Sequence, residues 1–212
     1  MSFELELSRG WIDAELAAEF PELALLQVRV KARSGRSPEL VKHRLREMSN
    51  RFTGPKAVQV RQQPVPWAYR VFFRQIGIDP DERRTPPEAA ALERMRAGAF
   101  KSTNLLDDAL LIATVETGVP VLAFDHDRVE GEVGLRLAQP GEHVGYGLRG
   151  GEIVTADDAG PLSVLFGECH PDRGVTPDTE RMLLAAVQVK GVPDVSVEEA
   201  LWTVTETLSA DV

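Results

Sequence analysis

The sequence is poor in cysteine and has no long apolar run. Cys169 is the single cysteine among 212 residues, so an internal disulfide is excluded and a cytoplasmic location is the default expectation. No apolar run approaches the ~18 residues of a membrane-spanning helix, and the acidic N-terminus, residues 1–6, lacks the apolar core of a secretory signal. These absences predict a protein without a membrane segment. The sequence also contains no internal repeat or low-complexity segment.

Net positive charge is lacking as well. The formal net charge is −9, which argues against a protein that coats nucleic acid through bulk electrostatics. The charge is uneven, however, because residues 29–101 hold 17 Lys and Arg against 7 Asp and Glu. This asymmetry indicates a polyanion partner, although solvated faces of Arg-rich helices would give the same pattern. The candidate phosphate contacts in this stretch are Lys42, Arg44, Arg46, Arg70 and Arg74.

The sequence does contain a change from helical patterns to short β-strand patterns near residue 118. Before it, capping residues and periodicity predict helices at about 13–20, 37–50, 66–75, 85–98 and 105–117, and strands at 3–7 and 24–32. After it, short β runs are expected at 119–124, 133–138, 152–156, 162–166 and 182–189, followed by a helix at 197–208. Ser37 and Ser196 are the expected N-caps of two of these helices. The order predicts an α+β fold, with a helical N-terminal half packed on a β-rich core, in a single domain of residues 1–212.

Three motifs are interpreted as structural. Residues 145–150 match GxGxxG, but a strand rather than a helix is expected after them, so they predict a hairpin turn and not a dinucleotide site. The four histidines lack metal-ligand spacing and one cysteine cannot build a zinc site, so no metal or other cofactor is expected. Cys169 and His170 are adjacent in an extended segment and therefore point to opposite faces. Cys169 is expected to be a packed thiol rather than a nucleophile.

Two carboxylates begin the apolar helix predicted at 105–117. Asn104 is the expected N-cap, and Asp107 three residues later completes something like a capping box. Asp108 shares a face with Leu111 and Ile112, which both look core-facing, so its carboxylate needs partners. Asp108 is either a satisfied structural group or part of a ligand pocket.

Two stretches carry a recognisable order of motifs. The first runs from Asn104-Leu-Leu-Asp-Asp through Gly118-Val-Pro-Val-Leu-Ala-Phe-Asp to a Gly-Glu turn at 141–142, and the second holds Phe166-Gly-Glu, Arg173-Gly-Val-Thr and Met182-Leu-Leu. This order resembles the tRNA-editing domain, or B3/B4 domain, of the β chain of bacterial phenylalanyl-tRNA synthetase. Upstream, residues 69–70, 74–80 and 94–96 are similar to stand-alone proteins with this domain. Together these stretches cover roughly residues 65–191.

The resemblance implies a β-sandwich-like core decorated by helices, and an activity. In the synthetase this domain hydrolyses the ester of tRNA that carries the wrong amino acid, tyrosine. The ester is already reactive, so positioning a water molecule and the terminal ribose supplies much of the rate. By the matched motifs, Asp108 or Glu168 would orient the water, and Arg173 would meet the terminal phosphate or the developing oxyanion. The implied substrate-binding residues are Asn104, Leu111, Pro120, Leu122 and Asp125.

This chain departs from the family pattern at Leu111 and Leu122, where family members commonly have Asn and His. An apolar pocket would not select tyrosine for its phenol, whereas the two leucines would equally serve to pack the core. The glycines after Gly167 are replaced by Glu168 and Cys169. These departures leave two further functions open. One is a non-catalytic module that binds a free amino acid or a similar small molecule, and the other is a protein that binds tRNA without chemistry.

Overall fold

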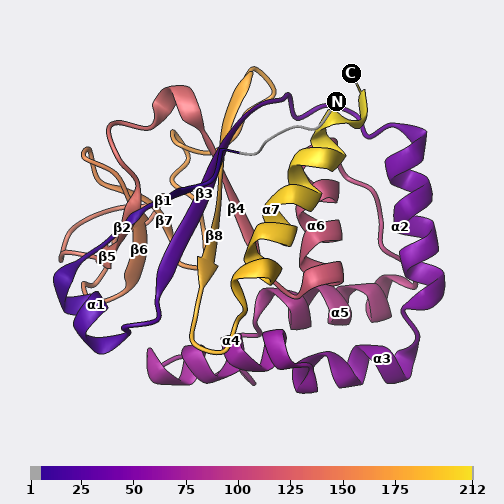
Figure 1. The fold of residues 1–212 in the computed structure, drawn as a ribbon, viewed down its shortest axis with the longest axis horizontal. Coiled ribbons are helices and arrows are strands. Elements are labelled where there is room, and N and C mark those ends of the chain that lie inside the picture. The colour runs from indigo at the N-terminus through magenta and orange to yellow at the C-terminus, as the bar shows by residue number, and fades with distance from the viewer. Residues whose placement is uncertain (1–5, 212) are drawn as a thin grey trace.

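Two four-stranded sheets face each other at the centre of the fold (Figure 1). The structure is a computed structural model that describes residues 6–211, so the strand expected at 3–7 lies almost wholly outside the described residues. Sheet A is antiparallel and has the order β1-β3-β8-β4. Sheet B has the order β2-β5-β6-β7, in which β2 and β5 run parallel. The α+β class and the sandwich-like core expected from the sequence are confirmed.

The strands of sheet A are β1 (Ser8–Arg9), β3 (Ala24–Lys31), β8 (Arg181–Gln188) and β4 (Val121–Asp125). Those of sheet B are β2 (Trp11–Ile12), β5 (Gly134–Leu137), β6 (Ile153–Ala156) and β7 (Pro161–Val164). The α-helices are α1 (Ala14–Glu19), α2 (Glu39–Arg51), α3 (Gly54–Gln59), α4 (Pro64–Gln75), α5 (Pro86–Ala97), α6 (Leu105–Thr117) and α7 (Asp194–Leu208). Short 3-10 turns are η1 (Val60–Gln62), η2 (His126–Arg128) and η3 (Ser209–Asp211).

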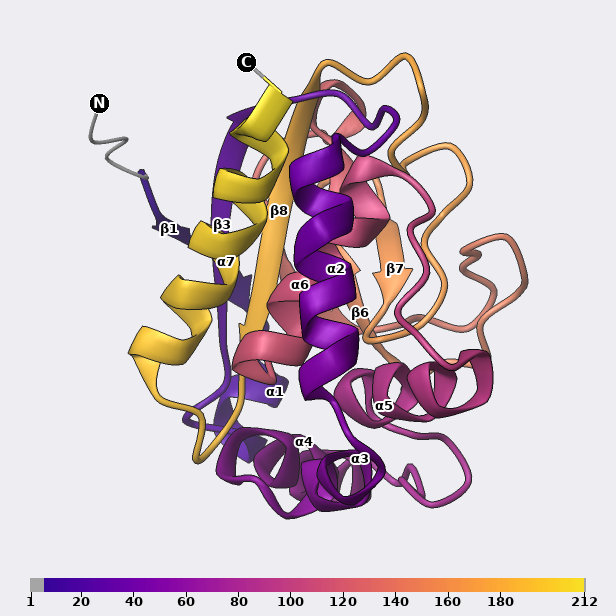
Figure 2. The same ribbon diagram turned by 90° about the vertical axis from the view of Figure 1, so that its right-hand side faces the viewer.

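Apart from α1, the α-helices form two groups around the sheets. α6 and α7 cover the face of sheet A that points away from sheet B, and α2 lies outside them (Figures 1 and 2). α3, α4 and α5 lie together across one end of the molecule. One hydrophobic core joins these layers, because side chains from α4, both sheets and α6 are fully buried in it. Its largest members include Tyr69, Phe73, Ile112, Phe124 and Leu135.

The chain crosses from sheet A to sheet B at Gly10. Its backbone N–H donates to the carbonyl oxygen of Leu25 over 2.9 Å. A Cβ at this position would lie 2.4 Å from the carbonyl oxygen of Val133 and 2.7 Å from a methyl carbon of Leu25. Glycine therefore allows the backbones of the two sheets to approach each other here.

Residues 166–175, called the strap below, link the free edges of the two sheets. At one end the strap pairs with β7, where His170 N donates to Leu162 O over 2.7 Å. At the other end Gly174 forms a bridge with Phe124 of β4, and the backbone N–H of Asp125 donates to Arg173 O over 3.1 Å. The strap therefore runs beside β4, the strand that carries several of the predicted site residues.

Two capping predictions are wrong. α2 begins at Glu39 after Pro38, and the hydroxyl of Ser37 donates instead to Asp108 Oδ2 over 2.6 Å. α7 begins at Asp194 after Pro193, two residues before the expected cap at Ser196. The GxGxxG segment does form a turn, with a bridge between His143 and Gly147, and β6 rather than a helix follows it.

Candidate functional site

The N-terminus of α6 is the first polar cluster among the predicted site residues. Asn104 caps the helix by accepting from Asp107 N over 2.9 Å, and it also accepts from the hydroxyl of Ser34 over 3.1 Å. Asp108 is 1% exposed and accepts three hydrogen bonds from two flanking loops. The donors are the Ser37 hydroxyl at 2.6 Å, the Ser102 hydroxyl at 2.6 Å and the Thr103 N–H at 2.9 Å. This arrangement favours the structural alternative for Asp108.

The second polar cluster lies where β4 ends. Asp125 is 5% exposed, accepts from the Thr179 hydroxyl over 2.7 Å and caps η2 by accepting from Asp127 N over 3.0 Å. On the strap, Arg173 pairs with Asp157, with an Nη1–Oδ2 distance of 2.7 Å, and also donates to Arg128 O. The guanidinium of Arg173 therefore ties the strap to the β6–β7 turn, and most of its hydrogen-bonding capacity is used within the protein.

A cavity of about 580 Å³, the sheet-end cavity, lies between these two clusters. On one side it meets Gly35 and Leu105, which neighbour Asn104 and are joined by a hydrogen bond of 2.8 Å from Leu105 N to Gly35 O. On the other side it meets Asp127 and Glu180, which neighbour the Asp125 cluster. The cavity is lined by Lys31, Ala32, Arg33, Gly35, Leu105, Asp127, Glu180, Arg181 and Leu208. It is large enough for a small organic ligand.

Pro120 and Glu168 lie at the opposite end of β4, next to α4. Pro120 follows the Gly118 turn, where a Cβ on Gly118 would lie 2.9 Å from Pro66 of α4. Glu168 is exposed, and it follows Phe166, whose ring stacks on Phe73 of α4 at 5.6 Å. The predicted site residues are thus spread along β4 and the strap, and the structure does not bring all of them into one pocket.

Leu111 and Leu122 belong to different layers. The register of sheet A places Leu122 opposite Ala185, on the face of the sheet that points to sheet B. Leu111 lies on α6, which packs on the other face. Both side chains are half-buried and pack against the main core. A ligand that reached both would have to extend around the free edge of β4.

Two buried hydroxyl groups were missed by the sequence reasoning. Thr155 of β6 and Ser163 of β7 are paired across sheet B, and their hydroxyl oxygens have no hydrogen-bond partner among the described residues. Thr155 also pairs with Leu135, a member of the main core. The row of Leu135, Thr155 and Ser163, called the hydroxyl row below, therefore faces the space between the two sheets, as Leu122 does. The only sequence signal is that inward positions of two apolar strands carry a hydroxyl.

His126 was also missed as a candidate. Burial, followed by the charges of Arg29 and Arg181, lowers the pKa of His126 below its ordinary value of 6.5. Its Nδ1 atom is buried without a partner among the described residues. The imidazole beside the sheet-end cavity is therefore mainly neutral at neutral pH.

Cys169 and His170 do not form a catalytic pair. Burial raises the pKa of the Cys169 thiol to about 11, and the thiol contacts the His170 carbonyl oxygen at 3.6 Å rather than its ring. The Nδ1 atom of His170 instead accepts from Asp172 N over 3.2 Å. Cys169 lies across from Ser163, so it packs as the fourth residue of the hydroxyl row.

The predicted phosphate contacts are largely engaged with acidic side chains. Lys42 pairs with Glu39 at 2.9 Å and Arg44 with Glu116 at 2.6 Å, while Arg46 and Arg74 lie 3.9 Å from a carboxylate. Arg70 requires a correction. It is 3% exposed and its guanidinium is held by Asp81 and Glu88, so it is an interior residue rather than a surface contact for RNA.

Three other cations lie at the sheet-end cavity or next to the serines that contact Asp108. Lys31 lines the cavity, Arg36 precedes Ser37, and Lys101 precedes Ser102, whose hydroxyls both meet Asp108. All three side chains are exposed, and none has an ion pair within residues 6–211. These three cations are thus more exposed than Arg70 and, unlike Lys42 and Arg44, are not held in a close ion pair.

The described residues contain no group of three or more His, Cys, Asp or Glu side chains that could hold a metal ion. Across residues 6–211, every helix is too short or too polar to cross a membrane.

Comparison with known proteins identifies the region that contains these clusters. A model of the B3/4 domain matches residues 68–199, more than half of the chain. The phenylalanine–tRNA ligase β subunit of Psychrobacter arcticus is 39% identical over 71 residues, which cover 31% of this chain and 9% of that subunit. The Xanthomonas campestris subunit is 39% identical over 83 residues, covering 39% and 10%, and the Streptomyces avermitilis subunit is 29% identical over 104 residues, covering 45% and 12%. The chain thus spans about a tenth of the length of the curated relatives it matches.

Proposed function

The chain belongs to the B3/4 domain family, and on that premise we propose that it binds aminoacylated tRNA and hydrolyses the ester of a mischarged one. The observation that carries the proposal is the extent of the family match. Residues 68–199 include α6, β4 and the strap, along which the predicted site residues lie. The relatives are subunits of a tRNA ligase, which supports a tRNA-related role for the shared region.

In this proposal the acceptor end of the tRNA enters at the sheet-end cavity. Lys31, Arg36 and Lys101 supply exposed positive charge there, and phosphate contacts require such charge. The terminal ester then lies along β4, between the strap and Leu122. Binding should weaken steeply with salt because counterions are released.

Of the two predicted catalytic carboxylates, Glu168 is the one that is not already bound within the protein. It is exposed and has no ion pair among the described residues, so it can orient a water molecule. Asp108 and Arg173 are already bound within the protein, so in this proposal they position α6 and the strap rather than touch the ester. Catalysis would come mainly from holding the reactive ester and water together.

The test is a panel of purified tRNAs, each charged with a cognate or near-cognate amino acid. We expect at least one ester to be cleaved faster than in buffer, and Glu168→Gln to slow that cleavage. Glu130→Gln is the matched control, because Glu130 is exposed and contributes its backbone N–H rather than its carboxylate to the Asp157 turn. If no ester is cleaved above the buffer rate, the hydrolase proposal is refuted.

The same panel tests specificity. Leu122 replaces a polar residue of the family pattern, and an apolar pocket discriminates by only ~10 to 200-fold per methylene. We therefore expect cleavage of apolar or several aminoacyl esters, without preference for tyrosine. If tyrosyl-tRNA is cleaved at least as fast as every aliphatic ester, the buried hydroxyls of Thr155 and Ser163 become the candidates for its phenol, and the apolar argument is wrong.

One observation favours a second function. Asp108 and Arg173 direct their polar contacts into the protein itself, as residues of a non-catalytic module would. Such a module would bind a free amino acid or a similar small molecule. Stabilisation of the fold by a free amino acid in a thermal-shift screen, with no tRNA shift on a gel, would support it over the hydrolase.

A further inference from the structure

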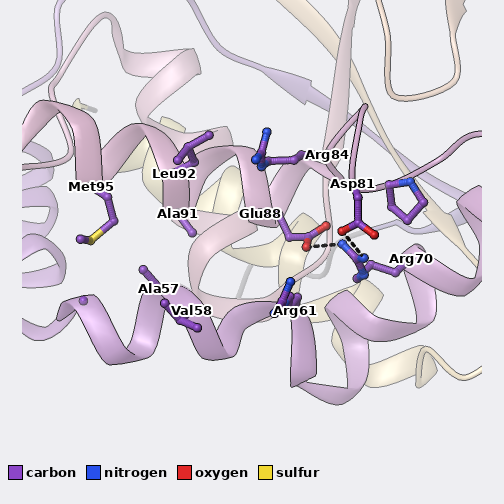
Figure 3. Close-up of a pocket in the computed structure, with 12 residues that line it drawn as sticks. Ala57, Val58, Arg61, Arg70, Asp81, Arg84, Glu88, Ala91, Leu92 and Met95 are labelled. Carbon is purple, nitrogen blue, oxygen red and sulfur yellow. Dashed lines mark hydrogen bonds and ion pairs between the residues drawn. The ribbon is translucent and has the colours of Figure 1, made fainter.

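A pocket of about 330 Å³ lies between α3, α4 and α5, at the end of the molecule that those helices cover (Figure 3). Arg70 is the only predicted site residue that lines it. The full lining is Gly54, Ala57, Val58, Arg61, Arg70, Pro80, Asp81, Arg84, Glu88, Ala91, Leu92 and Met95. Its volume is at the lower end of the range for small-molecule sites.

The pocket has an apolar end and a charged end. Figure 3 shows Ala57, Val58, Ala91, Leu92 and Met95 grouped along one half. Two of these side chains are unusually exposed for their type, Val58 at 66% and Met95 at 46%. A ligand with an apolar body would remove this surface from water and gain roughly 25 cal/mol for each Å² buried.

At the charged end, Arg70 organises the wall. Its side chain is 4% exposed and pairs with Glu88 at 2.5 Å and with Asp81 at 2.8 Å (Figure 3). Glu88 also accepts from the Thr85 hydroxyl over 2.8 Å as part of a capping box, so both of its oxygens are engaged. One buried arginine therefore pairs with both carboxylates of the pocket and offsets one of their two negative charges before any ligand arrives.

Arg61 and Arg84 remain available to contact a ligand. They reach in from opposite sides of the carboxylate pair in Figure 3, Arg61 from η1 and Arg84 from the turn before α5. Both are exposed and neither has an ion pair within residues 6–211. The lining thus holds three arginines against two carboxylates, an excess of one positive charge.

We propose that this pocket binds a small organic anion, whose carboxylate or phosphate head is held by Arg61 and Arg84 and whose apolar body lies against Ala57, Leu92 and Met95. Guanidinium groups suit both heads because their donors match paired oxygens. An RNA phosphate alone would leave the apolar half of the pocket uncovered. The proposal concerns a site apart from β4 and the strap, and it does not depend on ester hydrolysis.

The head group can be tested with probes that share one aliphatic body. Isocaproate and isoamyl phosphate carry an anionic head, leucine is the zwitterion of the same series, isoamylamine is the cation, and acetate has the head without the body. Titrations followed by amide NMR would report on Gly54, Ala57, Ala91 and Leu92. We expect isocaproate, isoamyl phosphate or both to bind saturably at these residues, and leucine, isoamylamine and acetate to bind at least about tenfold more weakly, a difference of about 1.4 kcal/mol.

Two kinds of variant separate the contributions. Arg61→Gln with Arg84→Gln should weaken the bound anion at least about tenfold, whereas Arg96→Gln, an exposed arginine of α5 outside the lining, should leave it unchanged. Ala57→Met should also weaken binding, because it fills the apolar end without altering any charge. The amide spectrum of each variant reports whether it still folds.

Three results would overturn the proposal. One is the absence of a saturable shift at the pocket for both anionic probes in the wild-type protein. Another is tighter binding of leucine or isoamylamine than of isocaproate, which would show that the carboxylates rather than the arginines select the ligand. The third is full affinity in the folded double arginine variant.

Discussion

The two polar regions of the molecule both enclose the charges that were predicted as site residues, and they differ in what is left unpaired in the lining. Among the described residues this is Lys31 at the sheet-end cavity, and Arg61 and Arg84 in the pocket between α3, α4 and α5. Around the sheet-end cavity, Asp108 and Arg173 are enclosed by donors and acceptors of the protein itself. In the pocket between α3, α4 and α5, the interior Arg70 is equally enclosed, but Arg61 and Arg84 are left exposed and unpaired within the described chain. Enclosed polar residues hold loops in place, and exposed, unpaired ones are free to bind a ligand. Residue type alone does not separate the two.

The largest expected effect tests the structural role of Asp108. Asp108→Ala removes the acceptor of three hydrogen bonds and leaves the buried hydroxyl of Ser37 without its partner. We expect a loss of about 3 kcal/mol or more in the free energy of unfolding, measured with urea. Asp107→Ala, at an exposed neighbour in the same helix turn, should cost much less. Equal losses in the two variants would show that Asp108 is not a buried anchor.

Arg70 should give the next largest effect. Arg70→Met leaves Glu88, whose side chain is only 10% exposed, without its ion-pair partner, and we expect a loss of about 2 kcal/mol. Arg96→Met is the matched control and should stay within about 0.5 kcal/mol of wild type. An Arg70→Met protein as stable as this control would mean that the ion pairs contribute nothing net.

The Arg70 effect should also depend on pH. The hydrogen bond from Arg70 holds the pKa of Asp81 below its ordinary value of 3.8. A carboxyl group with a lowered folded-state pKa stabilises the protein above its unfolded-state pKa, and this contribution is lost as the pH falls through the folded-state value. The stability difference between wild type and Arg70→Met should therefore be constant near neutral pH and shrink below pH 3.8. A difference that grew in acid would contradict this sign.

A smaller effect distinguishes the two sets of basic residues. Replacing Lys31, Arg36 and Lys101 together by Gln should lower the slope of log affinity for tRNA against log salt by roughly one for each lost contact. The same change at Lys42, Arg44 and Arg46 should alter the slope less, because these side chains already pair with Glu39 and Glu116. Wild-type affinity that is flat with salt would argue against a tRNA partner altogether.

These contrasts show where sequence reasoning worked and where it stopped. The α+β class and the Asn104 cap depend on local patterns, and both are as expected. The role of Ser37 could not be predicted, because its acceptor, Asp108, lies 71 residues away in the chain. The burial of Arg70 was also hidden, because its partners Asp81 and Glu88 are closer in the chain but belong to the following turn and helix rather than to α4. Hydrogen bonds and ion pairs between separate elements determine which charged side chains are left without a partner, and local sequence patterns do not reveal them.

The smallest expected effect on activity is that of replacing Cys169. Burial raises the pKa of its thiol from 9.0 to about 11, so near neutral pH the thiolate fraction should fall roughly a hundredfold, and alkylation by iodoacetamide should slow at least as much. The comparison is the native protein against the same protein in urea. Because the ring of His170 is not in contact with the thiol, Cys169→Ser should also retain most of any ester hydrolysis. Rapid native alkylation, together with a loss of about three orders of magnitude in a folded Cys169→Ser variant, would make Cys169 a nucleophile. The strap would then contribute a nucleophile to the reaction, in addition to the link between the two sheets that its backbone pairing indicates.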